Sequence, residues 1–173
     1  MNYTECIEQA RGRIGSYCKA CWECNGRACK NQMPGPGAKG IGDTAIRNYD
    51  KWKEIRVQMD TLVENRPCDT TLELFDRTFQ YPFFAGPVGA VQLHYGDCRN
   101  DTSHNNILVS ACAASGIAAF TGDGTDSNVM VAATKAIKNA GGLGIPTVKP
   151  WNIEVIREKV ALVSPLSFAL LIA

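Results

Sequence analysis

The sequence lacks any long apolar run, and its charges nearly cancel. No stretch of its 173 residues approaches the roughly 20 consecutive apolar residues that a transmembrane helix needs. The opening residues MNYTECIEQARGR are polar and do not contain the apolar segment of a secretory signal. The formal net charge of +1 provides no overall attraction to nucleic acid or to an anionic membrane. We therefore expect a cytoplasmic protein that binds neither nucleic acid nor membranes.

Histidine and the common nucleotide-binding motifs are also scarce. The chain has only two histidines, His94 and His104. Neither GxGxxG nor GxxxxGK[ST] follows the first predicted strand, so a Rossmann fold and a P-loop are disfavoured. We interpret both histidines as surface or hydrogen-bonding residues, and we assign no catalytic residue.

Cysteine, by contrast, is abundant, with eight residues in all. Four of them fall within twelve residues, spaced C-x2-C-x2-C-x4-C: Cys18, Cys21, Cys24 and Cys29. Disulfides are rare in a reducing cytosol, where a tight cluster more often binds metal. Asn25-Gly26 predicts the tight turn that such a loop needs, and four thiolates suit zinc or an iron–sulfur cluster. The alternative is a set of thiols in a basic loop that bind no metal.

The other four cysteines are scattered along the chain: Cys6, Cys68, Cys98 and Cys112. We interpret all four as inert thiols. Cys112 lies on the apolar face of a predicted helix, so we expect it in the core.

The apolar pattern divides the chain into three predicted parts. Residues 1–42 combine a short helix over 3–16 with the cysteine loop and a turn-rich segment. Residues 43–77 contain a helix predicted over 43–63, because apolar residues recur there every three or four positions. Residues 78–173 alternate strands with helices, the strands and their turns at 81–90, 117–124, 145–151 and 167–173, and the helices at 104–116, 127–142 and 152–163.

This alternation of apolar strands and helices predicts an α/β fold. A parallel sheet buried on both faces produces strands that are apolar throughout. Right-handed crossovers place every strand-to-helix loop at the same edge of the sheet. These loops are rich in glycine and short polar residues, as a site for a phosphate or a flat ring requires.

Several segments follow one another in a distinctive order. A glycine-rich run at 35–38 leads into a helix bearing Asn48 and Trp52, then a block at 69–75, and then Pro-Val-Gly at 87–89. In this order the segments resemble the FMN-dependent 2-hydroxy-acid oxidase and dehydrogenase family. The resemblance covers residues 35–163 and includes bacterial alpha-hydroxy-acid oxidizing proteins, which carry a similar N-terminal cysteine cluster. It implies a TIM (β/α)8 barrel, bound FMN and a small 2-hydroxy-acid substrate.

The resemblance also implies which residues contact the flavin: Pro87, Val88, Gly89, Ala90, Thr121, Gly122 and Lys149. The first four would approach the isoalloxazine ring through backbone groups. Thr121 and Gly122 would line its N5/O4 side, and Lys149 would face the flavin or the substrate. Glycine permits close backbone approach, and N–H donors tune the ring's electron affinity. The alternative is that these are barrel-rim turns, which need glycine in any case.

The chain also departs from the family pattern. It lacks the Ser-Asn-His-Gly context of the family's histidine base, and it has no tyrosine between Tyr17 and Tyr49 to bind a substrate carboxylate. A TIM barrel typically takes about 250 residues. We therefore expect a partial barrel of three to four β/α units behind a helical, cysteine-rich extension. The uncharged tail SPLSFALLIA suggests a frameshift or premature stop.

Two functions follow from these observations. The first is the N-terminal portion of an FMN-dependent oxidoreductase that transfers hydride equivalents from a 2-hydroxy acid to flavin. We expect this truncated form to be inactive, and a homo-oligomer. The second is a non-enzymatic metal-binding or electron-transfer module on a half-barrel scaffold. Retention of flavin discriminates between them, because the second predicts metal without flavin.

Overall fold

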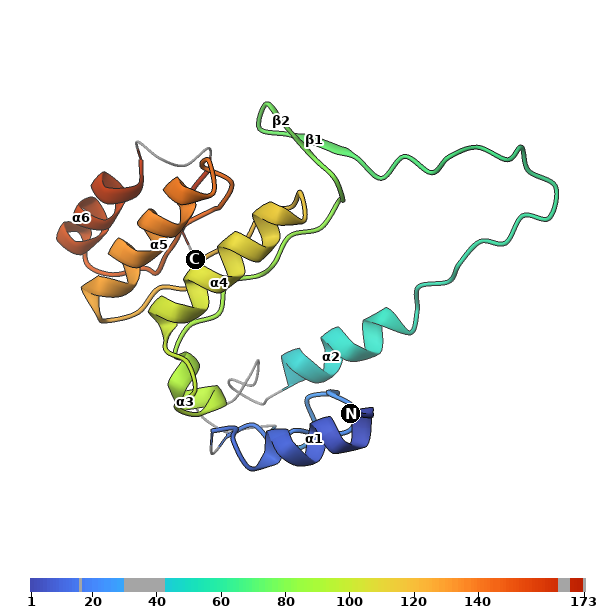
Figure 1. Ribbon diagram of the computed structural model, residues 1–173, viewed down its shortest axis with the longest axis horizontal. Helices are drawn as coiled ribbons and strands as arrows, with labels where there is room; N and C mark the ends of the chain where they lie inside the picture. Colours follow the sequence, from blue (N-terminus) through green and yellow to red (C-terminus); the bar gives the residue numbers. More distant parts are fainter. Residues whose placement is uncertain (16, 30–42, 165–168, 173) are drawn as a thin grey trace. The chain divides into compact units, whose positions relative to one another are not determined.

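The structure, a computed structural model, describes residues 1–15, 17–29, 43–164 and 169–172 (Figure 1). The chain forms two compact units. The first unit comprises Met1–Pro67 and Gln92–Arg99, and the second comprises Cys68–Val91 and Asn100–Ala173. Each unit is therefore assembled from two separate segments of the chain. The predicted boundaries after residues 42 and 77 stay predictions.

The first unit begins with α1 (Tyr3–Arg11), which ends earlier than the predicted helix over 3–16. Its start is fixed by a capping box. The Asn2 side chain accepts a hydrogen bond from the Glu5 N–H at 2.9 Å, and the Glu5 carboxylate accepts one from the Asn2 N–H at 3.0 Å. The helix ends at Arg11, followed by Gly12 as the C-cap.

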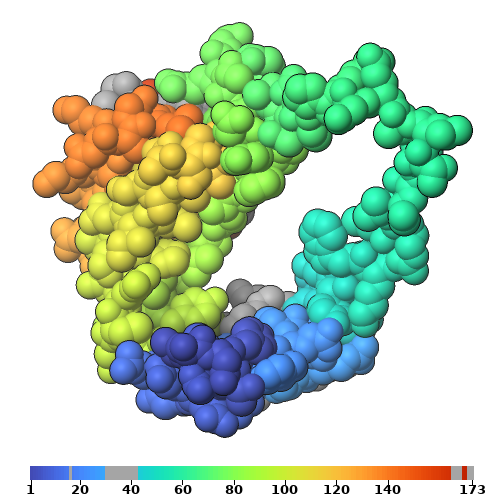
Figure 2. Space-filling model, turned by 45° about the vertical axis from the view of Figure 1, so that its right-hand side comes forward, coloured from blue at the N-terminus to red at the C-terminus, as the bar shows by residue number. Residues whose placement is uncertain are grey.

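The helix predicted over 43–63 is much shorter in the structure. α2 (Asp43–Trp52) ends at Trp52, and none of its residues is buried. Residues 55–67 form no helix or strand, and apolar residues of the predicted stripe are solvent-exposed, Met59 by 86% and Leu62 by 97%. In Figure 2 this segment, in teal, is a single run of chain. Since most helical stability comes from packing an amphipathic face, a stripe without a packing surface does not hold the helix.

α3 (Val91–Tyr95) was not predicted, and most of it belongs to the first unit. Two glycines allow it to pack against the chain between α1 and the cysteine loop. A Cβ on Gly15 would lie 2.5 Å from the Leu93 carbonyl oxygen, and one on Gly96 would lie 2.1 Å from the Arg13 carbonyl oxygen. Side chains at these two positions are therefore excluded.

The second unit opens with an unpredicted antiparallel hairpin of β1 (Leu72–Leu74) and β2 (Arg77–Phe79). Phe75 and Asp76 form its two-residue turn, and both have positive φ, +52° and +56°. Such a turn matches the right-handed twist of the strands. It places Leu72 opposite Phe79, whose side chain is fully buried.

Short parallel segments follow in chain order. Ala85 bridges Ala119, Phe120 bridges Ile145, and β3 (Thr147–Val148) pairs with β4 (Leu171–Ile172), all in parallel. The predicted order of strands and helices is present, but the strands are shorter than predicted, and in the described residues they do not close into a barrel.

Three helices connect these segments: α4 (Asp101–Ala114), α5 (Ser127–Asn139) and α6 (Ile153–Val163). α5 and α6 fall where the sequence predicted helices, and Asp126 caps α5, its side chain accepting a hydrogen bond from the Asn128 N–H. No helix within the described ranges has the length and apolar content that a membrane span requires.

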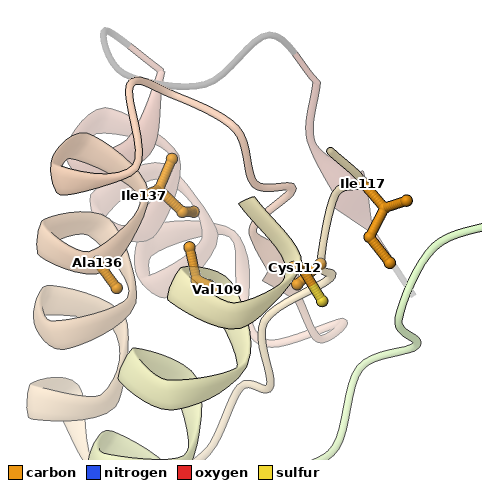
Figure 3. Close-up of a cluster of buried hydrophobic side chains, with 6 residues drawn as sticks. Val109, Cys112, Ile117, Ala136 and Ile137 are labelled. Carbon is orange, nitrogen blue, oxygen red and sulfur yellow. The ribbon is translucent and has the colours of Figure 1, made fainter. Parts of the chain in front are cut away.

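The main apolar cluster of the second unit lies between α4 and α5. Figure 3 shows this cluster, with Val109 and Cys112 on α4, Ala136 and Ile137 on α5, and Ile117 just after α4. Cys112 is 7% exposed, so its predicted place in the core is confirmed. Ile107, five residues before Cys112 in the same helix, is 48% exposed. α4 begins at Asp101 rather than residue 104 and buries the face that carries Asn105, Val109 and Cys112.

Candidate functional site

Asp123 is the centre of a hydrogen-bond network in the turn after Thr121, where the second parallel segment ends. The residue is only 2% exposed. Its Oδ2 accepts hydrogen bonds from the Lys149 backbone N–H at 2.9 Å and the Trp151 Nε1–H at 2.7 Å. Its Oδ1 accepts from the Lys159 ammonium at 2.5 Å. The Asp123 carboxylate thus links the turn that contains it, through hydrogen bonds, to the residues after β3 and to α6.

The charged groups in this network, on Asp123 and Lys159, are almost completely buried. The side chain of Lys159 is 10% exposed and that of Asp123 is fully buried. Burial by itself would raise the pKa of Asp123. The hydrogen bonds from Lys159, the Lys149 N–H and Trp151 outweigh burial, so the pKa lies below its ordinary value.

This depressed pKa predicts an acid-sensitive contribution to stability. In the unfolded chain the carboxyl titrates near pH ~3.9, so its charge stabilises the fold above that pH and loses its effect as the pH falls through the lower folded pKa. We expect the difference in unfolding free energy between wild type and Asp123→Asn to be constant above about pH 5 and to shrink below about pH 4. Urea unfolding at a series of pH values measures it. A difference that persists undiminished to about pH 2.5 would contradict the assignment.

The residues predicted to contact flavin come together at this edge. A Cβ on Gly122 would lie 2.0 Å from the Val88 carbonyl oxygen, and one on Gly89 would lie 3.1 Å from the Asp123 carbonyl oxygen. The 87–90 loop therefore packs directly on residues 122–123. Lys149 joins them through its backbone N–H, while its side chain is exposed.

Glycine at position 122 is needed for packing. Its Cβ position is filled by the 87–90 loop, and its N–H donates to the Asn105 Oδ1 at 3.0 Å. The exposed members of the predicted set are Pro87, Ala90 and Lys149. At Gly86, just before the loop, a Cβ would meet nothing within 4 Å, so the backbone there is open to approach.

Several buried polar atoms at this edge have no hydrogen-bond partner within the described part of the chain. They include the Thr121 hydroxyl and the Asn105 Nδ2, both on residues that are fully buried. An unsatisfied buried donor typically costs about 1–3 kcal/mol. Such groups in a folded protein call for an explanation, such as a bound water, ion or ligand.

Sequence reasoning missed four buried or half-buried residues at this edge: Asn105, Asp123, Trp151 and Lys159. Two signals could have found the charged pair. Lys159 lies on the apolar stripe of α6, between Ile156 and Val163, where a charged residue needs a partner. Asp123 follows a buried strand directly, and so stands at the edge where such a lysine can reach it.

The structure places both histidines partly at the surface. His94 and His104 are half-buried, and one ring nitrogen of each, Nδ1 and Nε2 respectively, is buried without a hydrogen-bond partner among the described residues. The His94 ring lies edge-on to Tyr17, with centroids 6.4 Å apart. Aromatic packing, which the sequence pattern does not reveal, places this ring.

The four clustered cysteines line one cavity in the first unit, of about 340 Å³. Other lining residues come from the same loop and from α2: Lys19, Asn25, Gly26, Ala28, Ala45, Asn48, Tyr49 and Trp52. Burial raises the pKa of the Cys29 thiol, as do the nearby Cys24, Cys18 and Cys21. The pKa of Tyr95 in α3 is also raised, by burial and then by Cys18 and Cys24. α3 therefore lies close to the same thiols.

The structure shows the predicted turn in this loop, but it shows no arranged metal-binding group among the described residues. Gly26 has a positive φ of +75°, consistent with the predicted turn, and a Cβ there would lie 2.7 Å from the Ala45 Cβ. All eight cysteines are thiols, with no disulfide. No group of three or more His, Cys, Asp or Glu side chains in the described ranges is arranged to hold a metal ion.

Comparison with known protein families identifies a match. The profile described as FMN-dependent dehydrogenase matches residues 35–158, most of the chain. The match contains the 87–90 loop, Thr121, Asp123 and Lys149, but it begins after the cysteine cluster. The glycine-rich run at 35–38, where it starts, lies outside the described residues. No curated protein and no solved structure matches the chain significantly.

Proposed function

This chain belongs to the FMN-dependent dehydrogenase family, and from that premise we propose that it forms the N-terminal portion of a flavin oxidoreductase acting on a small 2-hydroxy acid. The family implies an FMN cofactor and a TIM-barrel-type fold. Four parallel segments in chain order support the first units of such a barrel. We expect the chain alone to be catalytically inactive, and to form a homo-oligomer in the cytoplasm.

This proposal rests on two buried donors at the edge where the parallel strands end, which have no hydrogen-bond partner among the described residues. The Thr121 hydroxyl and the Asn105 amide are buried beside the 87–90 loop, and the backbone at Gly86 is open. The carbonyl oxygens and ring nitrogens of an isoalloxazine are acceptors that suit such donors. Thr121 and Asn105 would hold the ring edge, and the backbone at 86–87 would lie against its face. When bound, FMN supplies the electron acceptor for oxidation of the acid.

Gly122 has a supporting part in this arrangement. Because the 87–90 loop fills the space over it, the glycine sets the distance between that loop and the end of the second segment. Asp123 in turn fixes the first residues after β3. Both would position the loops around the proposed flavin site.

Flavin binding tests the proposal through a pair of matched variants. Thr121→Val removes a hydroxyl that we assign to flavin, so we expect FMN affinity to fall about fivefold, the loss of one hydrogen bond worth about 1 kcal/mol. Thr147→Val removes another buried, unpartnered hydroxyl, from a residue not assigned to flavin. It should leave FMN affinity unchanged. Titration of the full chain with FMN, followed by quenching of flavin fluorescence, measures both.

The control also separates binding from folding. Each substitution removes a buried hydroxyl without a partner, so neither should lower the free energy of unfolding. Failure of the wild-type chain to bind FMN, or equal losses of affinity in both variants, would argue against this site.

A second function is favoured by the cysteine cavity. Four thiols line one space, outside the residues that the family profile matches. They support a metal-binding or electron-transfer module that holds zinc or an iron–sulfur cluster. Metal retained without flavin would favour this function over the first.

A further inference from the structure

We propose that the four-cysteine cavity binds a four-iron, four-sulfide cluster, one thiolate to each iron, rather than a single zinc ion. The inference rests on metal binding by these cysteines, the second function proposed above, and it does not depend on flavin binding. The four ligands are those predicted from the spacing: Cys18, Cys21, Cys24 and Cys29.

The inference rests on the size of the cavity that the four cysteines line. A structural zinc site brings four sulfurs to about 2.3 Å from one ion. Here the four cysteines line a cavity of about 340 Å³, a larger space than one ion occupies. In a four-iron cluster each thiolate binds a different iron, so the ligands stand around the body of the cluster.

Contacts with two helices hold the loop around this space. Near the middle of the loop, the Tyr3 hydroxyl of α1 donates to the Trp22 carbonyl at 2.7 Å, and the two rings meet edge-on. Farther along, Arg27 pairs with Asp50 of α2 at 3.4 Å. The close packing of Gly26 on Ala45 adds a third contact. Contraction of the loop onto one ion would strain these contacts, whereas a larger cluster would fill the cavity.

The walls of the cavity suit an iron–sulfur cluster in their chemistry. Ala28, Ala45 and Trp52 contribute apolar surface to the cavity, and apolar surroundings influence the reduction potential of a cluster. The cavity also includes the amide side chains of Asn25 and Asn48, and amide N–H groups are donors that sulfide and thiolate sulfurs accept. Lys19 places a positive charge beside an assembly that four thiolates make negative.

Assembly of this cluster is balanced in atoms and charge. Two ferrous and two ferric ions combine with four sulfide ions and four thiols, each thiol releasing its proton as its Fe–S bond forms. The core then carries a charge of +2 and the four thiolates bring the total to −2. No further oxidant or reductant is needed.

Reconstitution of the full-length chain tests the inference. We expect the chain, incubated without oxygen with ferrous and ferric iron and sulfide, to retain about four irons and four acid-labile sulfides per chain. Its visible absorption should bleach on reduction with dithionite. A chain that takes up one zinc and no iron and sulfide, iron without sulfide, or no metal at all would overturn the proposal.

Cysteine variants identify the ligands. Cys24→Ser and Cys29→Ser should each lose most of the cluster, measured as iron and sulfide per chain. Cys6→Ser, which changes an exposed thiol of α1 outside the cavity, should retain the wild-type content. Equal content in all three variants would contradict the assignment. Released FMN is quantified separately by its fluorescence, so loss of the cluster and loss of flavin are distinguishable.

Discussion

Asp123→Asn should lower the free energy of unfolding by about 3–5 kcal/mol, because it removes one partner from a buried ion pair. Lys159 would keep its charge in a site where its side chain is only 10% exposed. The Lys149 and Trp151 N–H groups, both bonded to Oδ2, would also lose a charged acceptor. Urea denaturation followed by circular dichroism measures the loss.

The same substitution three residues later is the matched control. Asp126 caps α5 through its side chain, and asparagine is about as good an N-cap as aspartate. Asp126→Asn should therefore change the free energy of unfolding by less than about 0.5 kcal/mol. Comparable losses in both variants would mean that the loss reflects general charge removal rather than the buried pair.

Gly122→Ala is expected to cost about 3 kcal/mol, the upper end for overpacking, and to abolish FMN binding. The new methyl group would lie 2.0 Å from the Val88 carbonyl oxygen and 2.7 Å from its carbonyl carbon. Both are backbone atoms, so relief requires the whole 87–90 loop to move away. Unfolding and FMN titrations of the same preparations measure the two effects.

Gly124 provides the comparison for this substitution. It lies two residues from Gly122, but a Cβ there would meet nothing within 4 Å. Gly124→Ala should be neutral or stabilising by up to about 1 kcal/mol, since alanine reduces the freedom of the unfolded chain. A similar loss in both variants would show that the tight approach of Val88 is not responsible.

Sequence patterns predicted the helices in which the capping residues and the apolar period indicate the same bounds. α5 and α6 combine an apolar period with capping residues, and both lie at their predicted places. The spacing of the cysteines predicted that they act together, and all four line one cavity. In each case neighbouring residues in the sequence carry the information.

Features that depend on distant partners were not predictable in this way. The stripe from Ile46 to Leu62 has a helical period, yet the helix ends at Trp52 because none of its residues is buried. The β1–β2 hairpin turns on Phe75-Asp76 rather than on a glycine or asparagine pair, so its turn has no sequence signature. The burial of Lys159 depends on Asp123, which lies 36 residues earlier in the chain.

The division of the first unit between two chain segments has a consequence for synthesis. The last clustered cysteine is residue 29, whereas Gln92–Arg99, which completes the same unit, is made much later. At roughly 5–20 residues per second, translation separates the two by about 4–14 seconds. During that interval Gly15 has no α3 to pack against, and the thiols lack the neighbouring Tyr95. A nascent chain therefore presents these cysteines for several seconds before α3 can pack beside them and complete the unit.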